Sequence, residues 1–202
     1  LDGWGCIPAI VKPAQEHSSY GVTGEAVVLT PAELRERVAY VLGTFRQPAL
    51  VEDFIDGREF HVSLWGNGDI HVLPPAEMDF SSFADVHDRL CTYDSKFTPG
   101  SRHYEQILVR VPAPLAEAEY EELQQTAMAT YVAFGCRDYA RLDIRLRDGL
   151  FYVLDVNPNP DISADTSTAA AAAAAGFSYG AMASWLVALA AFRHPVYNGY
   201  QR

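Results

Sequence analysis

The alternation of hydrophobic and polar residues along the chain predicts strands and helices in mixed order. Short apolar runs bounded by turn residues predict strands over residues 7–12, 26–29, 49–54, 58–65, 69–73, 139–146 and 150–156. Apolar residues at every third or fourth position predict helices that begin at Thr30, span about 114–134, end before Gly176 and include 182–189. Residues 74–100 are expected to be largely irregular, with a short helix near 83–90. Because hairpins outnumber parallel crossovers, we expect an α+β fold.

The start of the first helix is marked by the sequence Thr30-Pro31-Ala32-Glu33. A threonine side chain accepts hydrogen bonds from backbone N–H groups at a helix start, and proline suits the first helical position. Glutamate at the third position completes a capping box. Leu34, Val38 and Val41 then share one stripe, so we expect an amphipathic helix.

Composition and charge limit the classes of partner. The 202 residues include 15 Lys and Arg against 26 Asp and Glu, which gives a formal net charge of −11. Nucleic acids and anionic membranes bind basic faces, so this balance argues against both partners and also predicts repulsion of polyphosphates. The longest apolar run is shorter than the roughly 18 residues of a membrane span.

Cysteine and histidine usage adds two expectations. Three cysteines without a CxxC motif are typical of free thiols in a reducing, cytoplasmic compartment. The six histidines show no HxH or HExxH spacing, so we expect surface or packing roles for them. The chain begins at Leu1 rather than Met, and we expect it to be a piece of a longer protein.

Two acidic residues, Asp143 and Asp155, lie on the two strands of the second hairpin, and its register decides whether they share a face. A two-residue turn at 148–149 would place them on opposite faces of the sheet. A three-residue loop at 147–149, with Gly149 in the left-handed conformation, would place them on the same face. We predict the three-residue loop because it requires glycine at its third position.

In the predicted register Arg141 pairs with Asp155, and both share a face with Asp143 and Asn157. Two carboxylates and an amide oxygen make an all-oxygen donor set that suits Mg²⁺. A solvent-facing surface with an Arg–Asp ion pair is the alternative. Spacing alone favours neither.

Several segments together resemble the ATP-grasp superfamily, specifically carboxylate–amine ligases of the D-alanine–D-alanine ligase type. The matching stretches follow the family's order and comprise residues 10–13 (IVKP), 18–22 (SSYGV), 51–60 (VEDFIDGREF), 93–97 (YDSKF) and the second hairpin. The resemblance covers about Pro8 to Leu189 and leaves out the family's N-terminal domain. It implies two α+β lobes that grip a nucleotide between antiparallel sheets.

The resemblance also implies lobe boundaries. Residues 1–54 would form the small lobe, with a flexible flap at 13–24 that covers the phosphates. Residues 55–202 would form the large lobe, with the metal site and a closing loop at 91–104.

The resemblance assigns phosphate contacts to Lys12, to Lys96 and to the flap residues Ser18 and Ser19. Backbone N–H groups in a small-residue loop suit an anion on physical grounds as well. For the two lysines, an ordinary strand-end or loop position is the alternative.

By the same resemblance, Glu52 and the backbone of Phe54 and Ile55 form the hinge that reads adenine. Glu59 resembles the acid that binds the ribose hydroxyls. Both glutamates lie beside a strand that could simply carry edge charges.

Asp143, Asp155 and Asn157 are the implied ligands of Mg²⁺, with Mn²⁺ as a further option, although most relatives carry Glu where this chain has Asp155. Arg141 resembles the residue that stabilises the acyl phosphate and the tetrahedral intermediate, with Ser18 and Lys96 completing the catalytic set. The implied reaction joins a small-molecule carboxylate and an amine through an acyl phosphate, with ADP and phosphate as products. A fixed cation aimed at developing oxyanion charge is a large catalytic contribution.

Two departures from the family bear on the substrate. Asp161 stands where D-alanine–D-alanine ligases carry glycine, and Phe97 replaces a common tyrosine. A carboxylate near the acceptor pocket would repel an amino acid's carboxylate, so we expect a related ligase rather than one that makes D-Ala-D-Ala. A non-catalytic ATP-binding or regulatory module is the alternative, but a pure binder has no need of Arg141.

Overall fold

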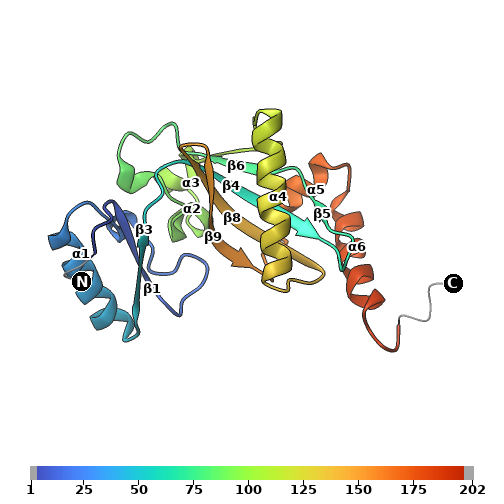
Figure 1. The fold of residues 1–202 in the computed structure, drawn as a ribbon, viewed down its shortest axis with the longest axis horizontal. Helices are drawn as coiled ribbons and strands as arrows, with labels where there is room; N and C mark the ends of the chain where they lie inside the picture. Colours follow the sequence, from blue (N-terminus) through green and yellow to red (C-terminus); the bar gives the residue numbers. More distant parts are fainter. Residues whose placement is uncertain (1–3, 198–202) are drawn as a thin grey trace. The chain divides into compact units, whose positions relative to one another are not determined.

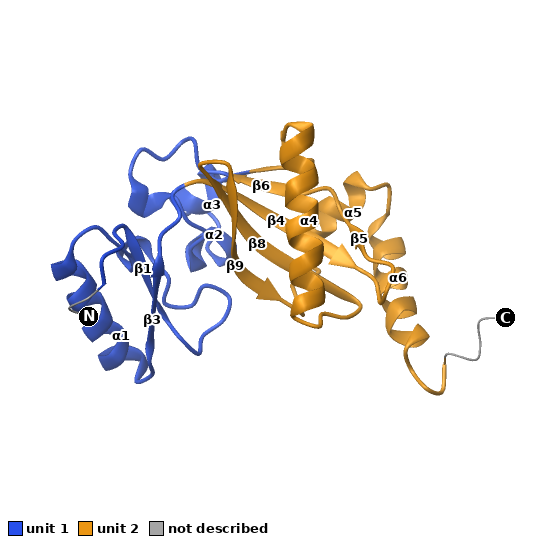
Figure 2. Cartoon of the chain, viewed as in Figure 1, with its two compact units in different colours: residues 1–56, 79–108 blue, residues 57–78, 109–202 orange. Residues whose placement is uncertain are grey.

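The structure is a computed structural model that describes residues 4–197, and it contains two compact units (Figures 1 and 2). The first unit contains the chain up to Asp56 together with Asp79–Leu108, and the second contains Gly57–Met78 and the chain from Val109 onward. The crossing after Asp56 lies two residues from the predicted lobe boundary. Residues 91–104, which we expected in the large lobe, belong to the first unit, because the chain returns to it after Met78. The outer ends of the predicted lobes, 1–3 and 198–202, lie outside the described residues.

The first unit contains a three-stranded antiparallel sheet in the order β2-β1-β3, covered by helix α1. Its elements are β1 (Ala9–Pro13), the short 3₁₀ helix η1 (Gly24–Ala26), β2 (Val27–Val28), α1 (Pro31–Phe45) and β3 (Ala49–Asp53). The predicted threonine cap is confirmed, because Thr30 Oγ1 accepts from the N–H of Glu33 at 3.2 Å. The Glu33 carboxylate accepts from the N–H of Leu29 at 2.7 Å, one residue before the Thr30 N–H that a capping box would use. The apolar stripe of α1 packs on the sheet through Leu34 and Val41.

The returning segment of the first unit is built from short helices. They are the 3₁₀ helix η2 (Val86–Asp88), α2 (Tyr93–Phe97) and α3 (Arg102–Gln106). The predicted helix near 83–90 is therefore only a single 3₁₀ turn. Asp85, Thr92 and Ser101 cap the three helices through side-chain oxygens, which explains how such short helices form in a stretch expected to be irregular.

The second unit is organised around a six-stranded sheet in the order β7-β6-β4-β8-β9, with β5 also paired to β4. Its strands are β4 (Arg58–Trp65), β5 (His71–Val72), β6 (Ala76–Asp79), β7 (Leu108–Arg110), β8 (Tyr139–Arg147) and β9 (Leu150–Asn157). The hairpins β4–β5 and β8–β9 match the prediction, but β6 and β7 were not foreseen. β6 has four residues and β7 has three, so neither is long enough for its apolar pattern to predict a strand.

Helix α4 (Glu117–Ala133) lies across one face of this sheet (Figure 1). Its Leu123, Ala127 and Tyr131 are fully buried against the apolar side chains of β4 and β8. Gly135, with φ +63°, ends the helical segment as predicted. Because α4 covers this face, only the opposite face of the sheet can carry a site.

Two further helices, α5 (Ser167–Ala174) and α6 (Tyr179–Phe192), pack together with Trp65 and Leu73. Both confirm the helices predicted around the alanine stretch. Among the described residues no single helix is long and apolar enough to cross a membrane, although α5 and α6 together pass that test while bent by 100°.

The turn of the β8–β9 hairpin differs from the prediction. Asp148 and Gly149, with φ values of +53° and +76°, form a two-residue turn, so Arg147 pairs with Leu150. Aspartate tolerates this left-handed conformation, which makes a third loop residue unnecessary.

A two-residue turn in a regular ladder would place Asp143 and Asp155 on opposite faces, but a β-bulge brings them back to the same face. Ile144 pairs with Val153 but Asp143 pairs with Asp155, so Leu154 is an extra residue on β9. Beyond the bulge Arg141 pairs with Asn157, not with Asp155 as predicted. The expected sharing of one face by the two aspartates is nevertheless confirmed, by a different route.

Candidate functional site

The face of the second sheet that points away from α4, here called the polar face, carries several of the side chains singled out from the sequence. Successive residues of a strand point to opposite faces, so the neighbours of the buried apolar residues of β4 and β8 lie here. Across β4, β8 and β9 they form three rows, Glu59–Arg145–Tyr152, His61–Asp143–Asp155 and Ser63–Arg141–Asn157. Directly opposite residues have Cβ atoms about 4.5–5.5 Å apart, so neighbours in a row are within reach of one another.

Arg141 and Asp143 form a two-pronged ion pair on this face. Arg141 Nε lies 2.7 Å from Asp143 Oδ1, and Nη2 lies 3.0 Å from Oδ2. Burial acts to raise the pKa of Asp143, but the nearby His61 and Arg141 outweigh it and hold that pKa below its usual value. Asp143 is therefore an ionised carboxylate, although its side chain is only 15% exposed.

Asp155 and Asn157 complete the predicted donor set beside Asp143. Asp155 is exposed and Asn157 is half-buried, and the Asn157 Oδ1 accepts a hydrogen bond from the N–H of Asn159 at 3.0 Å. This bond holds the amide side chain within its own loop. The structure thus brings two carboxylates and one amide oxygen onto the same face, which suits a hard divalent cation.

Glu59 occupies the first row and is almost completely buried. Its Oε2 lies 2.8 Å from Arg145 Nε and 2.7 Å from Arg145 Nη2. Burial alone would raise the pKa of Glu59, but Arg145 and His61 outweigh it and lower that pKa well below its usual range. The residue predicted to bind ribose is therefore ionised and oriented by an arginine partner.

His61 lies between these two acidic positions and was not singled out from the sequence. Its Nδ1 is 3.1 Å from Ser167 Oγ, while its Nε2 is 3.6 Å from Glu59 Oε1 and 3.8 Å from Asp143 Oδ1. Within residues 4–197 this buried Nε2 has no hydrogen-bond partner. One feature of the sequence could have identified His61. It lies two residues after Glu59 on the same strand, and residues two apart in a strand point to the same face.

Asp161 follows the donor set and closes its own turn. Its Oδ1 accepts from the N–H of Ser163 at 2.8 Å and from the Ser163 hydroxyl at 2.6 Å. These hydrogen bonds lower the pKa of Asp161, so an exposed negative charge stands at the position where the resemblance leads us to expect glycine.

In the first unit, Lys12 and Glu52 form an ion pair across the adjacent strands β1 and β3. The hinge that follows is buried, with Phe54 and Ile55 at 3% and 5% exposure. The N–H of Phe54 donates to the carbonyl of Pro8 at 2.9 Å. This hydrogen bond connects the predicted hinge at Phe54 to the residue before β1, the strand that carries Lys12.

Lys96 and the predicted flap are also brought together in the first unit. Lys96 Nζ lies 3.0 Å from Ser19 Oγ, and that hydroxyl in turn lies 3.1 Å from the carbonyl oxygen of Cys91. The two predicted phosphate contacts, 77 residues apart in sequence, are therefore neighbours. Periodicity could not have shown this, because the contact depends on the return of the chain to the first unit.

The flap has an unusual backbone. Ser18, Ser19 and Gly21 have φ values of +56°, +60° and +78°. Within the loop the N–H of Tyr20 donates to the carbonyl of His17, and the N–H of Val22 donates to that of Ser19, so not every N–H is directed outward. Left-handed serines are strained, and such strain is often found at binding loops.

The C-terminal end of the flap is fixed by its neighbours. Arg37 Nη2 donates to the Gly21 carbonyl at 2.7 Å. A Cβ atom added at Gly21 would lie 2.6 Å from the Phe45 ring, so this position requires glycine for space as well as for φ.

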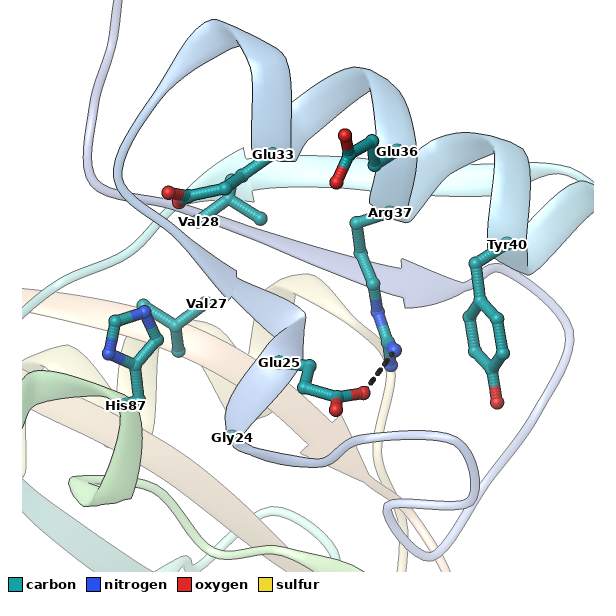
Figure 3. A pocket seen from close by; sticks show the side chains of 9 residues that line it. All are labelled: Gly24, Glu25, Val27, Val28, Glu33, Glu36, Arg37, Tyr40 and His87. Atoms are coloured by element: carbon teal, nitrogen blue, oxygen red, sulfur yellow. Dashed lines mark ion pairs between the residues drawn. The ribbon is translucent and has the colours of Figure 1, made fainter.

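A cavity of about 570 Å³ lies beside α1 in the first unit (Figure 3). Glu33, Glu36, Arg37 and Tyr40 line it from the helix, facing Glu25 and other residues of its opposite wall. A smaller cavity of about 290 Å³ in the second unit lies beside Trp65 and Trp185. None of the residues predicted to act in a site lines either cavity.

The chain matches the family model described as the D-ala D-ala ligase C-terminus over residues 3–188. Among curated proteins it is 34% identical over 189 residues to the uncharacterized protein y4sG of Sinorhizobium fredii, covering 93% of this chain and 53% of that protein. It is 31% identical over 185 residues to a D-alanine–D-alanine ligase of Desulforamulus reducens, covering 91% of this chain and 54% of that protein. The chain thus spans about half the length of these relatives.

Solved structures show the same fold. A D-alanine–D-alanine ligase from Bacillus anthracis complexed with ATP superposes with a TM-score of 0.69 at 22% identity, covering 91% of this chain and 52% of that one. The VanG D-Ala:D-Ser ligase from Enterococcus faecalis gives the same TM-score and identity, with 91% and 50% coverage.

Proposed function

Because the chain belongs to the D-alanine–D-alanine ligase C-terminal family, we propose that it is the ATP-binding and catalytic portion of a carboxylate–amine ligase. Its α+β architecture is the ATP-grasp fold of the solved ligases. The observation that carries the proposal is the polar face, where Arg141 lies beside Asp143, Asp155 and Asn157. A binding module without chemistry would not need a half-buried arginine paired with one of these metal-type ligands.

The residues of the polar face fit a divalent cation. Asp143, Asp155 and Asn157 would hold Mg²⁺, or Mn²⁺, through carboxylate and amide oxygen atoms. When bound, the cation would neutralise phosphate charge and reverse the local sign of an acidic surface. This accounts for how a chain of net charge −11 could accept a polyphosphate.

The nucleotide assignments rest on contacts within each unit. In the first unit Lys12 and Lys96 supply positive charge for phosphates, and the Ser18–Ser19 segment supplies small, left-handed residues beside Lys96. Phe54 and Ile55 would bind the adenine through their backbone, next to Glu52. In the second unit Glu59 would accept from the ribose hydroxyls, with Arg145 orienting its carboxylate.

The proposed reaction has two steps, both of which depend on positioning and charge. A carboxylate oxygen of the first substrate attacks the γ-phosphorus of ATP, and the bond to the bridging oxygen of ADP breaks. The amine nitrogen of the second substrate then attacks the acyl-phosphate carbonyl and expels inorganic phosphate. Arg141 would stabilise the oxyanion formed in each step, for which it must leave or share its pairing with Asp143.

Hydroxylamine trapping tests this proposal directly. Hydroxylamine attacks an acyl phosphate to give a hydroxamate and phosphate, so the complete gene product should form hydroxamate and ADP from ATP and a suitable carboxylate. Arg141→Met should abolish hydroxamate while leaving Mg-ATP binding intact. Binding of Mg-ATP with no carboxylate-dependent ADP release across a panel of acids would instead indicate a non-catalytic module.

Asp161 leads us to propose an acceptor other than D-alanine. Its exposed negative charge would repel an acceptor carboxylate and attract a cationic group. We expect Asp161→Gly to raise the reactivity of amino-acid acceptors relative to uncharged amines. Robust D-Ala-dependent phosphate release by the wild type, with D-Ala-D-Ala as product, would contradict this assignment.

A further inference from the structure

The buried nitrogen of His61 is the feature of the second unit that the proposed function has left without a role. The side chain is 6% exposed, and its Nε2 is one of the few buried polar atoms without a hydrogen-bond partner in the described chain. Buried polar atoms are nearly always satisfied in folded proteins, so an exception points to a group that binds there.

The surroundings of this nitrogen indicate the charge of the missing partner. Nε2 is 3.6 Å from Glu59 Oε1 and 3.8 Å from Asp143 Oδ1, and neither distance is a hydrogen bond. Two ionised carboxylates flank the atom, and strand pairing places His61 directly opposite Asp143. A cation is the partner that would be attracted by both carboxylates and accept the nitrogen lone pair.

The other ring nitrogen is already occupied. His61 Nδ1 lies 3.1 Å from Ser167 Oγ at the start of α5. A bound cation would take over the attraction that His61 exerts on the two carboxylates, with the ring proton on Nδ1 donated to Ser167 and the Nε2 lone pair directed at the cation. Metal-binding histidines commonly have this arrangement, in which one nitrogen donates a hydrogen bond and the other ligates.

We propose that His61 Nε2 is a nitrogen ligand of the cation held by Asp143, and that it biases the site towards Mn²⁺ over Mg²⁺. The inference deepens the proposed function, on whose metal site it rests. Magnesium prefers oxygen donors, whereas imidazole suits transition metals. An all-oxygen set of Asp143, Asp155 and Asn157 has no such bias, so the preference would come from His61.

Electron paramagnetic resonance of Mn²⁺ bound to the 202-residue chain, without nucleotide, tests this. We expect the wild type to show electron spin echo modulation from a directly bound ¹⁴N nucleus. His61→Gln should remove that modulation and weaken Mn²⁺ binding at least about tenfold, as loss of a metal-site residue typically does. Mg²⁺ affinity, measured by competition, should change much less.

His71→Asn is the matched control, because His71 lies opposite Trp65 near the end of β4 and is paired with Asp69, outside the three rows that contain the candidate ligands. It should leave both the ¹⁴N modulation and the Mn²⁺ affinity unchanged. If His61→Gln fails to fold, wild-type modulation that Asp143→Asn removes still places the nitrogen ligand at the site where His61 lies directly opposite Asp143.

The outcomes separate this inference from the function on which it rests. Mn²⁺ binding that Asp143→Asn abolishes, but that shows no ¹⁴N modulation in the wild type, would overturn the role of His61 and leave the metal site standing. Mn²⁺ binding that is insensitive to Asp143→Asn would overturn both. Modulation lost in His61→Gln without any ligase activity would support the nitrogen ligand and contradict the proposed function.

Discussion

The two faces of the second sheet are made by the same strands and are stabilised in different ways. On the α4 face Phe60, Leu142 and Ile144 are fully buried by apolar packing. On the polar face Glu59 and Arg145 are almost as buried, yet they are charged and paired. Burial on the polar face therefore does not follow hydrophobicity. The α4 face fixes the fold, and the polar face holds ionised groups at fixed positions.

The largest expected effect comes from breaking the α4 face. Phe60→Ala should lower the free energy of unfolding by about 3–5 kcal/mol, because it removes a fully buried aromatic ring and leaves a cavity. Urea unfolding followed by circular dichroism measures this. A loss below about 1 kcal/mol would show that the α4 face is not the packed core described above.

Breaking the buried pair of the polar face should have the next largest effect. Arg145→Met leaves Glu59 buried without its arginine partner, which should cost about 3 kcal/mol in the same unfolding measurement. The double variant Glu59→Gln with Arg145→Met should recover most of this loss, because no uncompensated charge remains. Additive losses in the two single variants and the double variant would contradict the pairing.

Asp143→Asn should affect ligand binding more than folding. Mg-ATP at about 100 times its dissociation constant should stabilise the wild type by about 2.7 kcal/mol, and the variant should lose most of that stabilisation. Thermal unfolding with and without Mg-ATP measures the difference. Asp148→Asn, an exposed carboxylate in the β8–β9 turn that is not among the assigned ligands, is the control and should keep the full stabilisation. No stabilisation of the wild type would contradict ATP binding altogether.

The smallest effect concerns a carboxylate that lies outside both faces. Hydrogen bonds from Arg193 lower the pKa of Asp138, and they outweigh the burial of Asp138, which would raise that pKa. A carboxylate with a lowered folded-state pKa contributes stability above its ordinary pKa of about 3.9, and that contribution is lost as pH falls further. Asp138→Asn should therefore cost about 1 kcal/mol at pH 7 and progressively less below pH 4.

Unfolding by urea at several pH values checks this dependence. Asp148→Asn changes an exposed turn residue and should alter stability by less than about 0.5 kcal/mol at any pH. Equal acid sensitivity of the wild type and Asp138→Asn would contradict the assigned role of Asp138.

Much of the fold was predictable because its signals are local. The cap at Thr30, the stripe of α4 and the alternation in β8 each act within a few residues, and each element formed as expected. The edge strands β6 and β7 were not predictable, because their short segments become strands only by pairing with neighbours brought from elsewhere in the chain.

The candidate site was predictable only in part for the same reason. The sharing of one face by Asp143 and Asp155 follows from strand parity, but the bulge that produces it has no sequence signal. His61 was interpreted as a surface or packing residue because its spacing to other histidines is uninformative. Its role depends on Ser167, 106 positions later, and on Asp143 across the sheet. The roles assigned to Lys12, Ser18 and Glu52 stay predictions.

The bulge at Leu154 has a consequence for how the chain finds its native pairing. Without it, a regular ladder from the two-residue turn would pair Leu154 with Asp143 and send Asp155 to the α4 side. That slipped arrangement would bury a carboxylate among apolar side chains, which is strongly unfavourable, and would leave a leucine among charges. The acidic residue thus discriminates against the competing alignment. The carboxylate of Asp155, proposed to bind a cation in the folded protein, would therefore also disfavour the wrong pairing of β8 with β9 during folding.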